Sequence, residues 1–97
     1  MNDIKLILGE SGKGAFVIEE ENERLAEMAL SITGNKMIVY HTEVSDKLAG
    51  QGVAKKLLAE MVEYARAHAL QVIPLCPFVK AQFERHPELY ADVWNGQ

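Results

Sequence analysis

The stretch that decides the fold is Gly50-Gln51-Gly52-Val53-Ala54-Lys55-Lys56-Leu57-Leu58. Two glycines flank one polar residue, and a helical pattern begins directly after them. Apolar residues then recur at spacings of three and four, as they do on one face of an amphipathic helix. These residues are Val53, Leu57, Leu58, Met61, Val62 and Ala65. The stretch therefore predicts a glycine-rich turn that leads into a helix over residues 52–68.

Such a turn is suited to binding a phosphate group. The first N–H groups of a helix have no intrahelical partner, and they lie at the positive end of the helix dipole. Lys55 and Lys56 occupy the first turn, which contains no acid. The alternative is that the glycines only form a turn and the lysines only face solvent. The stretch lacks the Gly-Lys-Ser/Thr ending of a Walker loop and the third glycine of a dinucleotide fingerprint.

The residues before the turn form a predicted strand, Lys36–Val44, which is rich in β-branched and aromatic side chains. A strand, a short loop and a glycine-led helix form a common phosphate site in α/β proteins. This context favours the binding hypothesis over a simple turn.

Composition limits the class of protein. The 97 residues are enough for one domain, residues 1–97, and 48% are hydrophobic, which allows a core without disulfides. The single cysteine, Cys76, and the lack of a signal peptide favour a reducing, cytoplasmic setting. The net charge of −4 argues against nucleic-acid binding, and no apolar run has the length of a membrane span.

The remaining chain predicts further strands before the helix and a strand and short helices after it. The predicted strands are Ile4–Leu8, Ala15–Glu19, Leu25–Thr33 and Gln71–Leu75, and short helices are expected over Phe78–Arg85 and from Pro87. Leu25–Thr33 also has helical features, but the turns on either side favour a strand. The first four strands are expected to be antiparallel, and the crossover helix makes the last strand parallel to Lys36–Val44. Pro74 cannot donate a ladder hydrogen bond, so the two parallel strands should diverge and leave a ligand cleft.

Two further segments give the chain a family resemblance. His41-Thr42-Glu43-Val44 precedes the glycine turn, and Pro74-Leu75-Cys76-Pro77-Phe78 follows the helix. With the turn, they resemble the GNAT superfamily of acetyl-CoA-dependent N-acetyltransferases, and more closely its small stand-alone GNAT-like proteins. The similarity extends from about Ala15 to Tyr90 and includes Arg85-His86-Pro87-Glu88.

The resemblance implies an α/β fold with a mixed GNAT-like sheet and an acetyl-CoA site. The loop Ala49–Ala54 is expected to bind the pyrophosphate through its N–H groups, and the strand ending at Val44 is expected to pair with the pantetheine arm. The expected cofactor-binding residues are therefore Val44, Ala49, Gly50, Gln51, Gly52, Val53, Ala54 and Lys55. The chain departs from the family in two places. Ala49 replaces the usual Arg or Gln, and Phe83 stands where many members have a tyrosine that protonates the leaving thiolate.

Three residues are candidates for catalysis. Cys76 follows the last strand, where it could accept the acetyl group or protonate the leaving thiolate, or only pack as a small hydrophobe. His41 and Glu43 alternate onto one strand face, and either could deprotonate an amine. Glu43 is the more typical base position in the superfamily, and His41 could instead be structural.

The resemblance thus implies an acetyl-CoA-dependent N-acetyltransferase that uses no metal and acts on an amine of a small molecule or a protein. We expect no nucleic-acid or membrane partner, and a monomer or weak dimer. The alternative is a non-catalytic acyl-CoA-binding or partner-binding module. A nucleotide-binding regulator is a third possibility.

Overall fold

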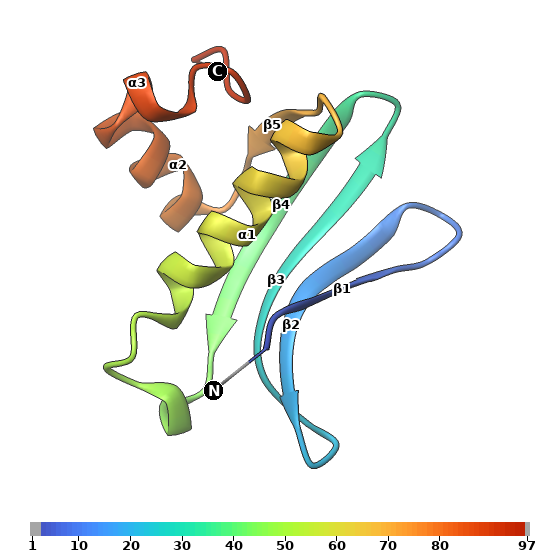
Figure 1. The fold of residues 1–97 in the computed structure, drawn as a ribbon, viewed down its shortest axis with the longest axis vertical. Helices are drawn as coiled ribbons and strands as arrows, with labels where there is room; N and C mark the ends of the chain where they lie inside the picture. The colour runs from blue at the N-terminus through green and yellow to red at the C-terminus, as the bar shows by residue number, and fades with distance from the viewer. Residues whose placement is uncertain (1–2, 97) are drawn as a thin grey trace.

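The computed structural model describes residues 3–96, which form one five-stranded sheet and a set of helices (Figure 1). The strands are β1 (Lys5–Leu8), β2 (Lys13–Glu20), β3 (Glu23–Thr33), β4 (Lys36–Val44) and β5 (Gln71–Pro74). The helices are the 3₁₀-helix η1 (Asp46–Leu48), α1 (Val53–Ala67), α2 (Pro77–Arg85) and α3 (Pro87–Tyr90). The predicted order of elements is confirmed. Leu25–Thr33 lies within β3 as a strand, and η1 was not predicted.

The sheet is mixed, as predicted. Its strands lie in the order β1-β2-β3-β4-β5, with antiparallel pairs up to β4 and a parallel pair between β4 and β5. Gly34 has a φ of 59° in the turn between β3 and β4, a conformation that glycine adopts without strain. The expected GNAT-like mixed sheet is therefore confirmed.

The core lies between the sheet and α1, which crosses one sheet face (Figure 1). The helix buries the apolar stripe read from the sequence, with Leu57, Met61 and Ala65 fully enclosed. It packs on Met37 and Val39 of β4, which have no exposed surface. Burial of this apolar area is the main force that holds α1 on the sheet.

The C-terminal segment lies beside α1 and closes the far end of the core. The Val72 N–H donates to the Val93 carbonyl over 2.7 Å, and Arg66 pairs with Asp92 at 2.6 Å. Val79 and Phe83 of α2 join the same core cluster. The face of the sheet opposite α1 is not covered by these helices, and we call it the open face.

Candidate functional site

The site begins where β4 loses its neighbour. β5 pairs with β4 only from Lys36 to Val39, and the last matched pair is Val39 with Pro74. The Cys76 N–H then donates to the Val39 carbonyl over 2.9 Å, and the chain turns into α2. The divergence predicted from Pro74 is confirmed. It leaves the edge of residues 40–44 of β4 without a strand partner on the β5 side.

A β-bulge lies at the same point of β4. Val39 is opposite Leu30 of β3, whereas His41 is opposite Ala29, so Tyr40 is an extra residue in β4. Strict alternation would place His41 on the same face as Val39, under α1. The bulge resets the alternation, so that His41 lies on the open face.

The open face gathers three titratable side chains. His41 and Glu43 of β4 share this face, as predicted, and Glu27 of β3 lies directly opposite Glu43. One ligand atom from each of the three lies within 4.8 Å of the others. The His41 Nε2 atom is 3.1 Å from Glu27 Oε2. These three residues, Glu27, His41 and Glu43, are called the open-face triad below.

Sequence reasoning did not find Glu27. Counting outward from the Gly34-Asn35 turn without a bulge places Glu27 opposite Thr42, on the face away from Glu43. The extra residue at Tyr40 moves Glu43 into that position instead. The signal that could have indicated Glu27 was its acidic side chain in a strand predicted to be half-buried.

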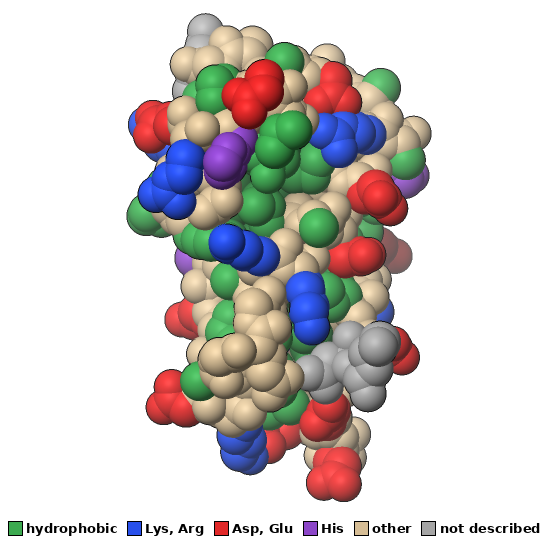
Figure 2. Space-filling view, turned by 60° about the vertical axis from the view of Figure 1, so that its left-hand side comes forward, with side chains coloured by type: hydrophobic (Ala, Val, Ile, Leu, Met, Phe, Trp, Pro, Cys, Tyr) green, Lys and Arg blue, Asp and Glu red, His purple; other side chains and the backbone are tan. Residues whose placement is uncertain are grey.

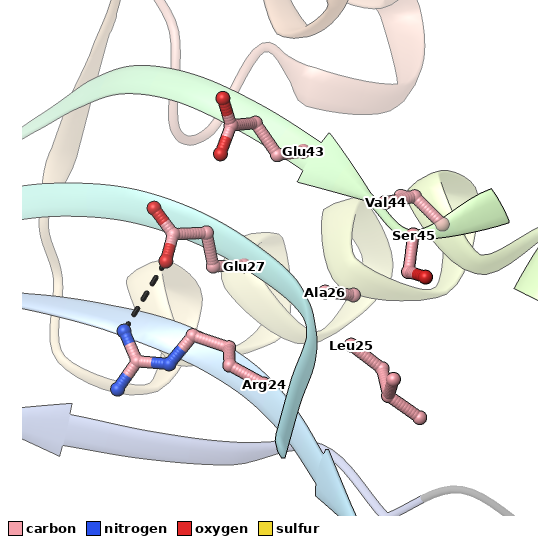
Figure 3. Close-up of a pocket in the computed structure, with 7 residues that line it drawn as sticks. All are labelled: Arg24, Leu25, Ala26, Glu27, Glu43, Val44 and Ser45. Atoms are coloured by element: carbon pink, nitrogen blue, oxygen red, sulfur yellow. Dashed lines mark hydrogen bonds and ion pairs between the residues drawn. The ribbon is translucent and has the colours of Figure 1, made fainter. Parts of the chain in front are cut away.

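Two members of the triad, Glu27 and Glu43, line a hollow where β3 begins and β4 ends (Figure 3). The cavity has a volume of about 540 Å³, and its lining residues are Arg24, Leu25, Ala26, Glu27, Glu43, Val44 and Ser45. In Figure 3 the side chains of Glu43, Glu27 and Arg24 lie next to one another on adjacent strands and extend away from Leu25 and Val44. The hollow therefore combines apolar lining residues with two carboxylates; Glu27 is paired with Arg24, and Glu43 can attract an ammonium group.

Hydrogen bonds from His41 and Arg24 hold Glu27 in the ionised form. His41 Nε2 and Arg24 Nη1 contact different oxygens of Glu27, the latter at 3.2 Å. The hydrogen bond from His41, followed by that from Arg24, lowers the pKa of the Glu27 carboxyl. The triad could also hold a divalent cation, since a histidine nitrogen and two carboxylates are common metal ligands.

Cys76 lies apart from the triad. It is 2% exposed at the start of α2, and its Sγ is 3.4 Å from Thr42 Oγ1, within hydrogen-bond distance. Thr42 is opposite Met28, a core residue, so its side chain points toward the helices rather than the open face. The structure thus places the candidate thiol and the candidate bases on opposite faces of the free half of β4.

The glycine turn leads into α1 as predicted. Gly50 and Gly52 have φ values of 79° and 68°, which favour glycine, and a Cβ on either would meet no protein atom within 4 Å. Gly52 is the N-cap of α1 and supplies no side-chain acceptor to the first helical N–H groups. These groups, with the exposed Lys55, can therefore hold an anion.

Figure 2 shows the side of the molecule that carries α2 and this turn, where both basic and acidic side chains surround a strip of hydrophobic ones. Among residues 3–96, no helix is both long enough and apolar enough to cross a bilayer.

The two family departures have clear structural settings. Phe83 is fully buried and packs against Tyr90 and Trp94, with ring centroids 4.7 and 5.5 Å away. It therefore serves the core of the C-terminal segment. Ala49 is exposed, so a longer side chain has room there.

Comparisons with known proteins agree with this geometry. Residues 15–93 match the family model of the GCN5-related N-acetyl-transferases. A Staphylococcus aureus protein assigned to the GCN5-like N-acetyltransferases, solved by NMR, is 39% identical over 100% of this chain and 93% of its own, with a TM-score of 0.72.

More distant structures share the fold alone. An IAA acetyltransferase from Bacillus cereus is 17% identical with a TM-score of 0.62, over 92% of this chain and 75% of its own. The ribosomal-protein-S18-alanine N-acetyltransferase from Escherichia coli is 13% identical with a TM-score of 0.58, over 68% of this chain and 43% of its own. The family match covers most of the chain, and the fold and the split between β4 and β5 agree with it. The chain belongs to the GCN5-related N-acetyltransferase family.

Proposed function

We propose that the protein transfers an acetyl group from acetyl-CoA to an amine carried by a small molecule or a protein. One observation carries the proposal: the free edge of β4, residues 40–44, leads within a few residues to the glycine turn and the N-terminus of α1. A strand edge can bind an amide-containing arm through its main chain, and the helix start can bind a pyrophosphate. Coenzyme A joins these two groups in one molecule.

The cofactor contacts follow from this arrangement. The pantetheine arm pairs with the edge that ends at Val44, and the pyrophosphate lies on the turn and first helical N–H groups. The proposed binding residues are Val44, Ala49, Gly50, Gln51, Gly52, Val53, Ala54 and Lys55. The first turn of α1 contains no acid, which supports an anion at this position.

The transfer needs a base for the amine and a proton for the leaving sulfur. His41 or Glu43 takes a proton from the amine, whose nitrogen attacks the thioester carbonyl carbon. The C–N bond forms, the C–S bond breaks, and the sulfur of coenzyme A takes a proton. Cys76 is the proposed donor, because Phe83 has no hydroxyl and is enclosed in the core.

An acyl-carrier role for Cys76 is the rival mechanism. Incubation with acetyl-CoA alone would then add the mass of one acetyl group to the protein, and the kinetics would be ping-pong. As a proton donor, Cys76 leaves no adduct, and Cys76→Ser retains part of the rate. Both mechanisms require Cys76→Ala to lower turnover while coenzyme A binding stays nearly intact.

The test of the function is thiol release from acetyl-CoA in the presence of an amine panel, with acetylated products identified by mass. We expect amine-dependent release that falls in Cys76→Ala. Binding of acetyl-CoA without turnover of any amine would support the alternative, a non-catalytic acyl-CoA-binding module. The hollow lined by Glu27 and Glu43 favours the enzyme, because it offers an acceptor a place next to Glu43, one of the two proposed bases.

A further inference from the structure

A chain of hydrogen bonds crosses the open face and ends on His41. Arg24 donates from Nε to Glu19 Oε2 and from Nη1 to Glu27 Oε1, each over 3.2 Å. The other oxygen of Glu27, Oε2, lies 3.1 Å from His41 Nε2. One carboxylate oxygen of Glu27 therefore bonds to Arg24 and the other to the His41 imidazole. The Glu27 side chain is only 24% exposed.

The bulge at Tyr40 makes this contact possible. Without the extra residue, His41 would point toward the core with Val39, on the face away from Glu27. The strand thus carries an irregularity whose effect is to bring an imidazole beside a carboxylate. Bulges often re-aim a side chain near an active site.

The contact also selects the tautomer of His41. A carboxylate can only accept hydrogen bonds, so His41 must donate from Nε2. Arg24 pairs with Glu27 and supports its ionised form. In a neutral imidazole with its proton on Nε2, the lone pair lies on Nδ1, which is then the atom that can accept a proton.

We propose that Glu27 is the positioning residue of the acceptor-side base: it holds His41 in the Nε2–H tautomer and stabilises the imidazolium that forms when Nδ1 takes a proton from the amine. This inference rests on the proposed acetyl transfer. One N–H proton of the amine passes to Nδ1, the nitrogen bonds to the acetyl carbon, and the C–S bond breaks. The sulfur takes its proton from Cys76 or water, and His41 returns its own to solvent.

The charged groups beside His41 are Glu27 on β3 and Glu43 on β4 itself. Arg24 of β3 is linked to His41 through Glu27. Within residues 3–96, the Glu43 side chain makes no hydrogen bond or ion pair. Its carboxylate is therefore available to the amine. The division of roles is then a base, His41, with an orienting carboxylate on one side and an ammonium-binding carboxylate on the other.

The experiment compares Glu27→Gln with Glu20→Gln, which removes the same charge from an exposed position on β2. Glu27→Gln should lower kcat by on the order of 10–100-fold, less than loss of a general base, which costs about 10²–10⁴-fold. Coenzyme A binding should not change, and Glu20→Gln should behave as wild type. In the His41→Ala background, Glu27→Gln should add no further loss, because it acts through the imidazole.

Nitrogen-15 NMR of the His41 ring gives a readout that does not depend on turnover. Wild type should show a protonated Nε2 and a free Nδ1, and Glu27→Gln should show a mixture of tautomers. If wild type is active and Glu27→Gln shows an unchanged kcat or an unchanged His41 tautomer, the positioning role of Glu27 is overturned and the proposed function is not. A wild type that binds acetyl-CoA but acetylates no amine would overturn the proposed function and this role with it. Activity that a chelator removes and zinc restores would identify the triad as metal ligands and also overturn the positioning role.

Discussion

The two halves of β4 belong to one strand but have opposite surroundings. Lys36–Val39 pairs on both edges, and its inward side chains Met37 and Val39 are completely buried under α1. In residues 40–44, His41–Val44 pair only with β3 and Tyr40 is the bulge residue, and His41 and Glu43 are exposed. The bulge at Tyr40 lies at the boundary.

The comparison shows how one strand can serve both stability and chemistry. The paired half buries apolar area and orders its backbone through two ladders, whereas the free half keeps an edge and a polar face for ligands. Elements with free edges and exposed side chains contribute less to stability and more to binding. Substitutions in the two halves should therefore separate stability from activity.

The largest expected effect follows from truncating one residue in each half. Met37→Ala should lower the free energy of unfolding by about 2–5 kcal/mol, because it leaves a cavity in the core. The turnover of the folded fraction should stay near that of wild type. His41→Ala should lower turnover by about 10²–10⁴-fold, with a stability change within about 0.5 kcal/mol. Urea unfolding and thiol-release assays measure both, and a stability loss in His41→Ala equal to that in Met37→Ala would contradict the division.

The next effect concerns the glycine turn beyond the free half. Acetyl-CoA at ~100 times its dissociation constant should stabilise wild type by about 2.7 kcal/mol. Gly52→Asp should remove this stabilisation, since it adds negative charge where the pyrophosphate lies. Thermal unfolding with and without ligand measures it.

Gly34→Asp is the matched control for that variant. Gly34 also has a positive φ and open space around its Cα, but it lies in the turn at the other end of β4. The two variants carry the same charge and similar backbone strain. If both lost the ligand effect, or neither did, the glycine turn would not be the pyrophosphate site.

A smaller gain is expected at Ala49. Ala49→Arg restores the side chain that family members usually carry, on an exposed position with room for it. We expect tighter coenzyme A binding by on the order of 1 kcal/mol, through a phosphate contact that weakens with salt. Titration calorimetry at two salt concentrations measures this. Weaker binding, or a gain that salt does not affect, would show that the loop holds the ligand differently.

The smallest effect concerns the C-terminal segment, which bonds to β5, the strand that pairs with Lys36–Val39. Its Asp92 forms an ion pair with Arg66 of α1. The hydrogen bond from Arg66 lowers the pKa of the Asp92 carboxyl below its ordinary value of 3.8, so the ionised carboxylate stabilises the fold at pH values above this ordinary pKa. The contribution is lost as pH falls through the lower, folded value. Asp92→Asn should therefore destabilise the protein slightly at neutral pH, and the difference from wild type should vanish in acid. Glu84→Gln, on the exposed side of α2, is the control. A difference that grew in acid would contradict this sign.

Much of the fold could be predicted from local sequence signals. The apolar stripe from Val53 to Ala65 predicted α1 and its buried face, and Pro74 predicted where β5 leaves β4. The bulge at Tyr40 could not be predicted, because tyrosine is a good strand former and nothing near it breaks the pattern.

Local sequence signals indicated some residues of the candidate site but not the residue that another strand contributes. His41, Glu43 and Cys76 lie in segments that resemble family motifs, so the sequence could indicate them. Glu27 comes from a different strand, and its contact with His41 depends on a register that the bulge shifts by one residue. The burial of Phe83 against Tyr90 and Trp94 likewise depends on how the C-terminal segment folds back.

The most direct test of the central claim, that the free half of β4 and the glycine turn hold acetyl-CoA, is an amide NMR titration of the wild-type protein. We predict that acetyl-CoA shifts the backbone amides of residues 40–44 and 50–55 most, while those of residues 36–39 change little. No shifts at millimolar acetyl-CoA, or shifts centred on the separate pocket that Leu6 of β1 and Glu60 and Tyr64 of α1 line, would contradict the claim.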